Sequence, residues 1–94
     1  MPTLLVRHKV QDYATWKPIY DQDATNRKSG GSQGARLLRS ASDPNEIVIL
    51  FEWDDLDKAR QFATSDTLRE AMQRAGVVGH PDIYFLEEIE TAPA

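Results

Sequence analysis

The spacing of hydrophobic residues changes along this chain in an order that few folds can accommodate. Apolar residues alternate with a period of two, as strands do, over residues 3–10, 36–40, 47–53 and 82–89. A period of three and four residues, typical of helices, separates the first strand from the second and the third from the fourth. The order β-α-β-β-α-β predicts an α+β, ferredoxin-like fold, in which a four-stranded antiparallel sheet carries both helical regions on one face.

The third strand indicates that the sheet is covered on both faces. Ile47, Phe51 and Trp53 point to one side, and Val48 and Leu50 point to the other, so both sides are mostly apolar. A single domain, residues 1–94, buries only about 60 to 65% of the surface that its unfolded chain exposes. Because the helices cover one face only, we expect the other to meet a second subunit in a homodimer. Residues 90–94 are expected to fray.

The composition excludes several classes of function. The net charge is -4 and basic residues are interspersed with acidic ones, which argues against nucleic acid as a partner. The chain has no cysteine, so disulfides, thiolate nucleophiles, iron–sulfur clusters and the usual structural zinc sites are excluded. The apolar runs are too short to cross a membrane, and the N-terminal residues show no signal-peptide pattern. A cytoplasmic location is the default expectation.

The first helical region is predicted over residues 16–29. Asp12 and Thr15 are both candidate N-caps, and Pro18 would fall in the first turn, where a helix has no amide hydrogen bond to lose. The inward stripe would contain Trp16, Ile19, Tyr20, Ala24 and Arg27. The glycine-rich stretch 30–34 follows this helix instead of preceding one, so a phosphate-binding loop is not expected.

The second helical region is predicted in two pieces. Asp54 or Asp55 caps the first piece, and residues 65–66 interrupt the helix before it resumes over residues 67–75. The buried positions of the first piece would be Leu56, Ala59, Phe62 and Ala63. Gly76 ends the second piece, and residues 77–81 are predicted to form a loop that carries His80 to the mouth of the space between helices and sheet.

The chain resembles the antibiotic biosynthesis monooxygenase-like group of dimeric α+β barrel proteins. Four segments carry the resemblance: residues 4–10, Asp12-Tyr13 with Trp16 after it, Phe51-Glu52-Trp53 leading into residues 55–59, and Ser65-Asp66 followed by residues 68–72. The resemblance implies a homodimer whose two sheets close into a barrel, with a pocket between sheet and helices in each subunit. Activities in this group include cofactor-free oxygenation of aromatic polyketides, haem degradation and small-molecule cyclisation.

The residues of this chain disfavour haem and metal chemistry. The haem-degrading branch of the group places an asparagine, a tryptophan and an iron-ligating histidine where this sequence has His8, Phe62 and Met72. The only two histidines, His8 and His80, lie at opposite ends of the chain, so no converging metal ligands are expected. The chain contains no Gly-x-Ser-x-Gly sequence, the motif that would indicate a serine hydrolase.

The resemblance therefore implies a monooxygenase-like or cyclase-like protein that acts without a cofactor on a small aromatic or polyketide-type compound. His8 is the candidate base, and the candidate substrate-binding residues are Trp16, Tyr20, Phe62, Met72 and His80. The alternative is a non-catalytic small-molecule-binding or structural dimer, in which the aromatic residues are core and His8 bonds to Tyr13 or water. A cavity large enough for a ring system would favour ligand handling, and a filled core would favour the structural reading.

Overall fold

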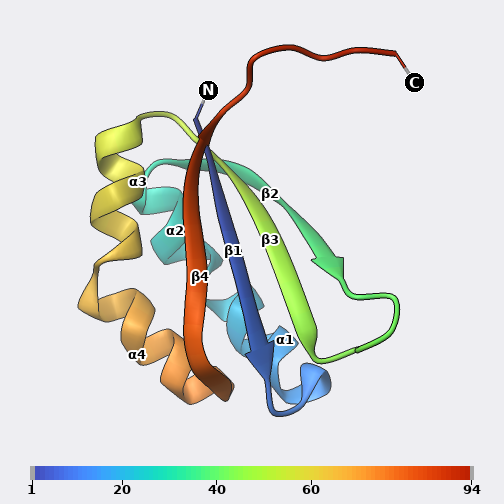
Figure 1. Cartoon of the computed structure of the whole chain (residues 1–94). Coiled ribbons are helices and arrows are strands. Elements are labelled where there is room, and N and C mark those ends of the chain that lie inside the picture. Colours follow the sequence, from blue (N-terminus) through green and yellow to red (C-terminus); the bar gives the residue numbers. More distant parts are fainter. Residues whose placement is uncertain (1, 94) are drawn as a thin grey trace.

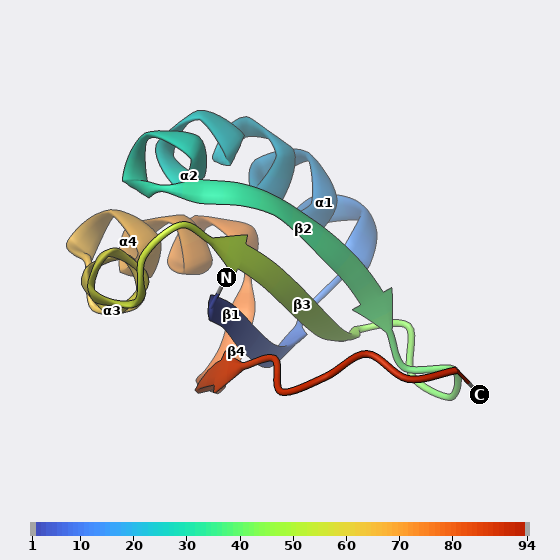
Figure 2. The same cartoon turned by 90° about the horizontal axis from the view of Figure 1, so that it is seen from above.

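The computed structural model describes residues 2–93 and has the predicted order of elements, with each helical region divided in two (Figure 1). The elements are β1 (Pro2–Val10), α1 (Tyr13–Gln22), α2 (Ala24–Gly30), β2 (Ser32–Arg39), β3 (Glu46–Trp53), α3 (Leu56–Ala63), α4 (Asp66–Ala75) and β4 (Val77–Glu87). The strands are antiparallel in the order β2-β3-β1-β4, and the helices lie on one face (Figure 2). The predicted fold class is confirmed.

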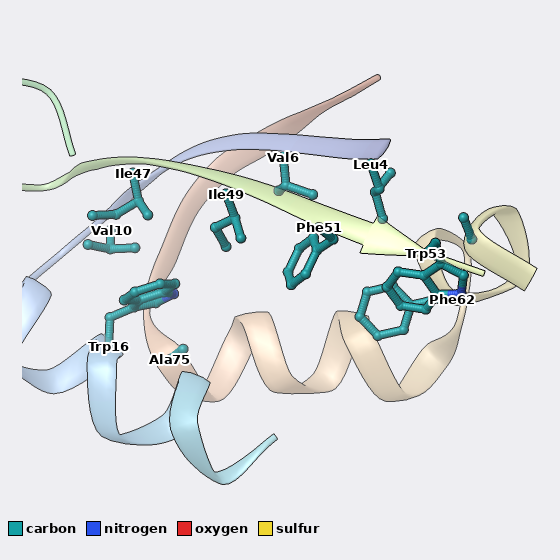
Figure 3. Close-up of a cluster of buried hydrophobic side chains, with 11 residues drawn as sticks. Leu4, Val6, Val10, Trp16, Ile47, Ile49, Phe51, Trp53, Phe62 and Ala75 are labelled. Atoms are coloured by element: carbon teal, nitrogen blue, oxygen red, sulfur yellow. The ribbon is translucent and has the colours of Figure 1, made fainter. Parts of the chain in front are cut away.

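The core lies between the sheet and the helices because β1 and β3 alternate as the sequence predicts (Figure 3). The buried side chains of these strands are Leu4, Val6, His8 and Val10 in β1, and Ile47, Ile49, Phe51 and Trp53 in β3. Trp53 is fully buried, and its indole Nε1 donates a hydrogen bond of 3.0 Å to the carbonyl oxygen of Gly30. Trp53 therefore joins the end of β3 to the end of α2.

The first helical region differs from the prediction at its start. The Asp12 side chain accepts a hydrogen bond of 3.1 Å from the Thr15 backbone N–H, so α1 begins at Tyr13 instead of residue 16. Pro18 consequently lies inside α1 and not in its first turn. Thr15, the other candidate cap, is a helical residue.

The helix also breaks at Asp23, which the sequence did not predict. The Asp23 N–H is shared between the carbonyl oxygens of Ile19 and Tyr20, each at 3.2 Å, and α2 starts at the next residue. The break turns Asp23 inward and leaves Ala24 exposed, although Ala24 was expected in the inward stripe.

The second helical region follows the prediction more closely. The carboxylate of Asp55 caps α3, accepting from the Lys58 N–H at 3.1 Å. Ser65 caps α4, accepting from the Leu68 N–H at 3.2 Å. Ala59 and Phe62 are buried as expected, whereas Leu56 and Ala63, which begin and end α3, are only partly buried.

The predicted loop over residues 77–81 is wrong, because these residues belong to β4. Val77 and Val78 pair with Val10 and Lys9 as soon as α4 ends, so no loop is needed. The irregularity expected there appears instead as a bulge: Arg7 pairs with Asp82 and Lys9 with Val78, so β4 has two more residues than β1 between these pairs, beside His8. β2 also begins at Ser32, earlier than predicted, and β4 ends at Glu87.

Residues 88–93 follow β4 without helix or strand and extend away from the body of the molecule (Figures 1 and 2). Ile89 in this segment is 96% exposed. The tail predicted at residues 90–94 ends in Ala94, which, like Met1, lies outside the described residues.

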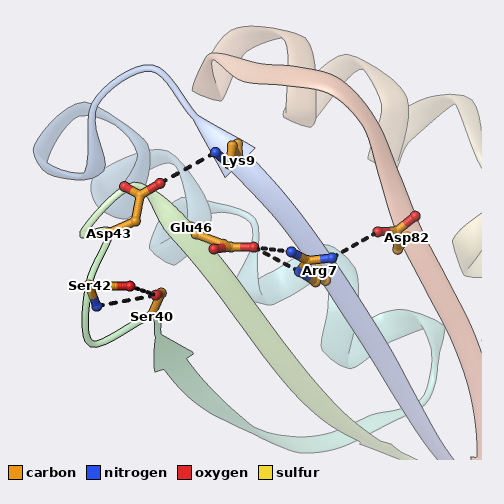
Figure 4. Close-up of polar contacts among 7 residues, drawn as sticks. All are labelled: Arg7, Lys9, Ser40, Ser42, Asp43, Glu46 and Asp82. Atoms are coloured by element: carbon orange, nitrogen blue, oxygen red, sulfur yellow. Dashed lines mark hydrogen bonds and ion pairs between the residues drawn. The ribbon is translucent and has the colours of Figure 1, made fainter.

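The face of the sheet that the helices leave open is partly apolar and partly charged. Six of its apolar residues form what we call the open-face cluster: Leu5, Leu38, Val48, Leu50, Tyr84 and Leu86. Beside the cluster, Arg7 lies between Glu46 of β3 and Asp82 of β4 (Figure 4). The Arg7 Nε donates to Glu46 Oε1 at 2.8 Å, and its NH1 lies 3.6 Å from Asp82 Oδ2.

Candidate functional site

A small cavity lies between the sheet and the helices, with a volume of about 40 Å³. Its walls come from β1, β3 and all four helices, and they are mainly aromatic and aliphatic. Five lining residues carry polar or charged groups: His8, Tyr20, Asp23, Arg27 and, through its indole N–H, Trp16. The site is therefore an apolar chamber with a few polar groups, as small-molecule sites are.

Five of the six residues that sequence reasoning assigned to the site line this cavity: His8, Trp16, Tyr20, Phe62 and Met72. His80 does not. It is exposed on β4 and lines a separate outer groove between the α3–α4 region and β4. Leu68 and Met72 line both spaces, so these two side chains of α4 separate the outer groove from the cavity.

Among residues 2–93, His8 is the only side chain with fully buried nitrogen or oxygen atoms that lack a hydrogen-bond partner. The residue is 6% exposed, and neither Nδ1 nor Nε2 has a partner. The hydrogen bond to Tyr13 that the structural interpretation expected is absent; the rings of His8 and Trp16 instead form a T-shaped pair, with centroids 5.6 Å apart and an interplanar angle of 73°. A buried unpaired polar group costs about 1 to 3 kcal/mol of stability, so this arrangement calls for an explanation.

Burial also sets the protonation state of His8. Loss of water lowers the pKa of the His8 imidazole from its usual 6.5 to about 4. The ring is therefore neutral at pH 7. A neutral imidazole presents one N–H donor and one acceptor nitrogen, and both face the cavity walls without a protein partner.

The aromatic residues of the site pack against one another. Trp16 and Tyr20 are stacked, with ring centroids 4.8 Å apart and an interplanar angle of 21°. The ring centroids of Tyr20 and Phe51 are 6.5 Å apart. Phe51 and Phe62 form a T-shaped pair with ring centroids 6.1 Å apart. Trp16 and Tyr20, two of the predicted substrate-binding residues, therefore each have one ring face already in contact with the other. Burial raises the pKa of the Tyr20 hydroxyl, which stays protonated at neutral pH.

Two charged residues of the site were not identified as functional from the sequence. Asp23 is 6% exposed and Arg27 is 9% exposed. The Asp23 carboxylate accepts a 2.7 Å hydrogen bond from the Asn26 side-chain amide. Asp23 was missed because residues 16–29 were read as one unbroken helix, whereas Arg27 was placed on the inward stripe and given no role. A charge within an apolar stripe was the available signal.

The size of the cavity limits what it can hold in this conformation. Space for one water takes about 10 to 15 Å³ by this measure, so the cavity accommodates about three waters. A benzene-binding cavity in a protein is about 150 Å³. A ring compound therefore enters only if the walls move, and the half-buried side chains of Leu68 and Met72 form one wall with an open groove behind it.

Two further features bear on the class of site. Within residues 2–93, no three His, Asp or Glu side chains converge as metal ligands do. In that same part of the chain, no helix combines the length and the hydropathy needed to cross a bilayer.

Several solved structures share this fold. A candidate antibiotic biosynthesis monooxygenase from Bordetella bronchiseptica matches with a TM-score of 0.80 at 17% identity, over 95% of this chain and 97% of that one. SnoaB, a cofactor-independent oxygenase from Streptomyces nogalater, matches with a TM-score of 0.78 at 18% identity, over 99% and 97%. A candidate antibiotic biosynthesis monooxygenase from Caulobacter crescentus matches with a TM-score of 0.74 at 20% identity, over 95% and 90%.

No protein-family model and no curated protein matches the sequence. The structural likenesses confirm the resemblance to antibiotic biosynthesis monooxygenase-like proteins that the sequence segments indicated. At identities of 20% or less, what they share with this chain is the fold. The chemistry has to be argued from the cavity.

Proposed function

We propose that the protein binds a small aromatic or polyketide-type compound in the helix-side cavity and removes a proton from it. This is the first step of a cofactor-free monooxygenase-like or cyclase-like reaction. The observation that carries the proposal is His8, a neutral and fully unpaired imidazole buried in an apolar, aromatic cavity. A bound phenol or enol supplies the missing partner by donating its O–H to the acceptor nitrogen of His8.

The lowered pKa of His8 shapes the proposed proton transfer. Charging the imidazole in the empty cavity costs about 3 kcal/mol relative to water, because the pKa falls from 6.5 to about 4. When the proton comes from the substrate, the imidazolium forms beside the substrate anion. Their attraction is strong where water is excluded, and it offsets that cost. His8 is therefore a weak base for solvent protons and a better one for a bound carbon acid.

The two proposed reactions differ in what the substrate anion does next. In oxygenation, the carbanion carbon gives up electrons to dioxygen and forms a C–O bond, and the resulting peroxide takes the proton back from His8. Loss of water from this hydroperoxide leaves a carbonyl group where the CH₂ group was, so one dioxygen yields one carbonyl oxygen and one water. In cyclisation, the carbanion attacks a carbonyl carbon of the same molecule, and His8 returns its proton to the alkoxide.

Tryptophan fluorescence tests binding, because the chain has two tryptophans and only Trp16 lines the cavity. We expect planar phenols and anthrones to quench the fluorescence saturably, and Trp16→Phe to abolish the response while Trp53 still reports an intact core. Met72→Ala removes part of the wall between the cavity and the outer groove, which enlarges the cavity and should strengthen binding. The circular dichroism of each variant verifies its fold.

Oxygen uptake with the ligands that bind tests catalysis. His8→Ala should slow uptake by about 10² to 10⁴-fold if His8 is the base. His80→Ala removes the other histidine, which lies outside the cavity, and should leave the rate unchanged. Uptake that is equally fast in His8→Ala and in the unaltered protein would remove His8 from the chemistry. For the cyclase-like reaction, the same pair of variants is compared by product analysis.

The small volume of the cavity favours a second candidate, a non-catalytic dimeric domain. About 40 Å³ bounded by stacked rings is close to a filled core, in which His8 is satisfied by one or two buried waters. The absence of a saturable response to every phenol and anthrone, in the unaltered protein and in Met72→Ala, would support this candidate over the first.

We also propose that the open-face cluster is the interface of a homodimer. Leu38 and Leu86 are each 40% exposed and Tyr84 is 55% exposed, on the face opposite the helices. Together with the neighbouring Leu5, Val48 and Leu50 they form an apolar patch of the kind that marks interfaces. This apolar patch is complementary to the same patch on a second copy of the chain, as a two-fold interface requires.

A further inference from the structure

Arg27 carries a charge that is buried without an acidic partner. The residue is 9% exposed, yet no carboxylate of residues 2–93 lies within 4.0 Å of its guanidinium group. One nitrogen, NH1, donates to the carbonyl oxygen of Tyr20 at 2.8 Å. The guanidinium carbon lies 3.9 Å from the centroid of the Tyr20 ring. These two contacts hold the group in place and leave most of its five N–H donors unused by the protein.

Arg27 also occupies a special position between two spaces. Among residues 2–93, Arg27 alone lines both the helix-side cavity and a second outer groove, which lies between α2 and the start of β2. The only charged residues of that groove are Arg27 and Lys28, and the others are small or uncharged. The groove is thus positive in a chain whose net charge is -4. Asp23 lines the cavity and not the groove, so an anion that approaches from the groove reaches Arg27 first.

We propose that Arg27 binds the carboxylate of a small apolar acid, with the acid's anionic end at the mouth of the groove and its apolar end directed into the cavity. A carboxylate fits the guanidinium fork with two parallel hydrogen bonds, and the apolar part of the ligand fits the aromatic lining of the cavity. The inference rests on the proposed function, because it requires the cavity to admit a ligand. It names the class of compound that the site selects: an acid attached to an apolar or aromatic group.

Benzoate and benzamide test this inference, since they have the same ring and differ in the charge of the head group. Binding to the full chain is measured by calorimetry and by tryptophan fluorescence at low salt. We expect benzoate to bind at least about tenfold more tightly than benzamide. Arg27→Gln should remove that preference. Arg74→Gln is the matched control: it makes the same change at an exposed residue of α4 that lines neither the cavity nor the groove, and the preference should remain.

The outcomes separate this inference from the proposed function. If both ligands bind with equal affinity, or if Arg27→Gln retains the preference for benzoate, the carboxylate site is overturned while the ligand cavity stands. If neither ligand nor any phenol binds, the cavity proposal fails and the carboxylate site fails with it. Should Arg27→Gln not fold, the NMR signal of the Arg27 Nε–Hε group decides, because benzoate should shift it and benzamide should not.

Discussion

His8 shows how one position in a strand acquires unusual chemistry. The alternation of β1 turns Val6, His8 and Val10 toward the helices, so the imidazole enters the core with its hydrophobic neighbours. Tyr13 could have supplied a hydroxyl partner, but its aromatic ring packs against Trp16. Because no protein group bonds to His8, its protonation state depends on burial alone.

At this scale we predict a specific pH dependence of stability. The pKa of His8 is about 4 in the folded protein and about 6.5 in the unfolded chain, so the unfolded chain binds more protons between these values. The contribution of neutral His8 to the free energy of unfolding is therefore complete above pH 6.5 and is lost as the pH falls toward 4. Between pH 7 and pH 4.5, the free energy of unfolding should fall by about 2 to 3 kcal/mol more in the unaltered protein than in His8→Gln.

Urea unfolding at the two pH values measures this difference. His80→Gln is the control, because it removes the exposed histidine and should follow the unaltered protein. If His8→Gln and the unaltered protein lose the same amount of stability, the imidazole is not held neutral in the folded state.

At the scale of elements, the junction between α2 and β2 decides how closely the helices lie on the sheet. Gly31 ends α2 with a φ of +116°, and its N–H bonds to Lys28 O at 3.2 Å. The Gly31 carbonyl accepts from the Asp54 N–H at 3.1 Å, beside the Trp53–Gly30 hydrogen bond. These contacts connect the end of the first helical region to the end of β3, and they leave no room for a side chain at position 31.

Two alanine substitutions separate backbone strain from this close approach. A Cβ at position 31 would lie 2.5 Å from Asp54 Oδ1 and 2.9 Å from Trp53 Nε1, whereas one at Gly34 would meet nothing within 4 Å. Both glycines have positive φ, so both changes cost about 1 to 3 kcal/mol of strain. Gly31→Ala should cost about 1 to 3 kcal/mol more than Gly34→Ala, because it also displaces Trp53 or Asp54. Denaturant unfolding of the two variants measures the gap, and equal losses would show that position 31 can relax.

At the scale of the whole molecule, the two faces of the sheet are covered unequally. The helix side encloses the core and the cavity, while the open-face cluster remains in contact with solvent in a single copy of the chain. A 94-residue domain has little core to spare, so covering this face with a second copy would add substantially to its stability. The ion pairs of Arg7 with Glu46 and Asp82 lie beside the cluster.

We predict that the protein is a homodimer in solution, with twice the 10.6 kDa mass of a single chain. Leu50→Glu puts a charge into the middle of the open-face cluster and should convert the dimer to a monomer in light scattering or native mass spectrometry. Ala14→Glu, on the exposed surface of α1, adds the same charge on the helix side and should remain dimeric. A monomer in the unaltered protein would leave the apolar side of β3 unexplained.

The sequence by itself determined the order of elements, the faces of the strands and most of the helix ends. These follow from local physics: the alternation of β1 and β3, the capping side chains of Asp55 and Ser65, and the need for a residue such as Gly76 after α4. For the same reason, sequence reasoning brought His8, Trp16, Tyr20, Phe62 and Met72 to one side of the sheet, where the structure places them around one cavity.

Only the tertiary structure decided the volume of that cavity, the isolation of His8 and the burial of Asp23. Residues 77–81 joined β4 because Val10 and Lys9 were available as pairing partners, which the local sequence does not record. The local sequence likewise does not record the position of His80, which the bulge in β4 places in the outer groove. Packing depends on residues far apart in the chain, and a few ångströms of side-chain position separate a filled core from a binding site.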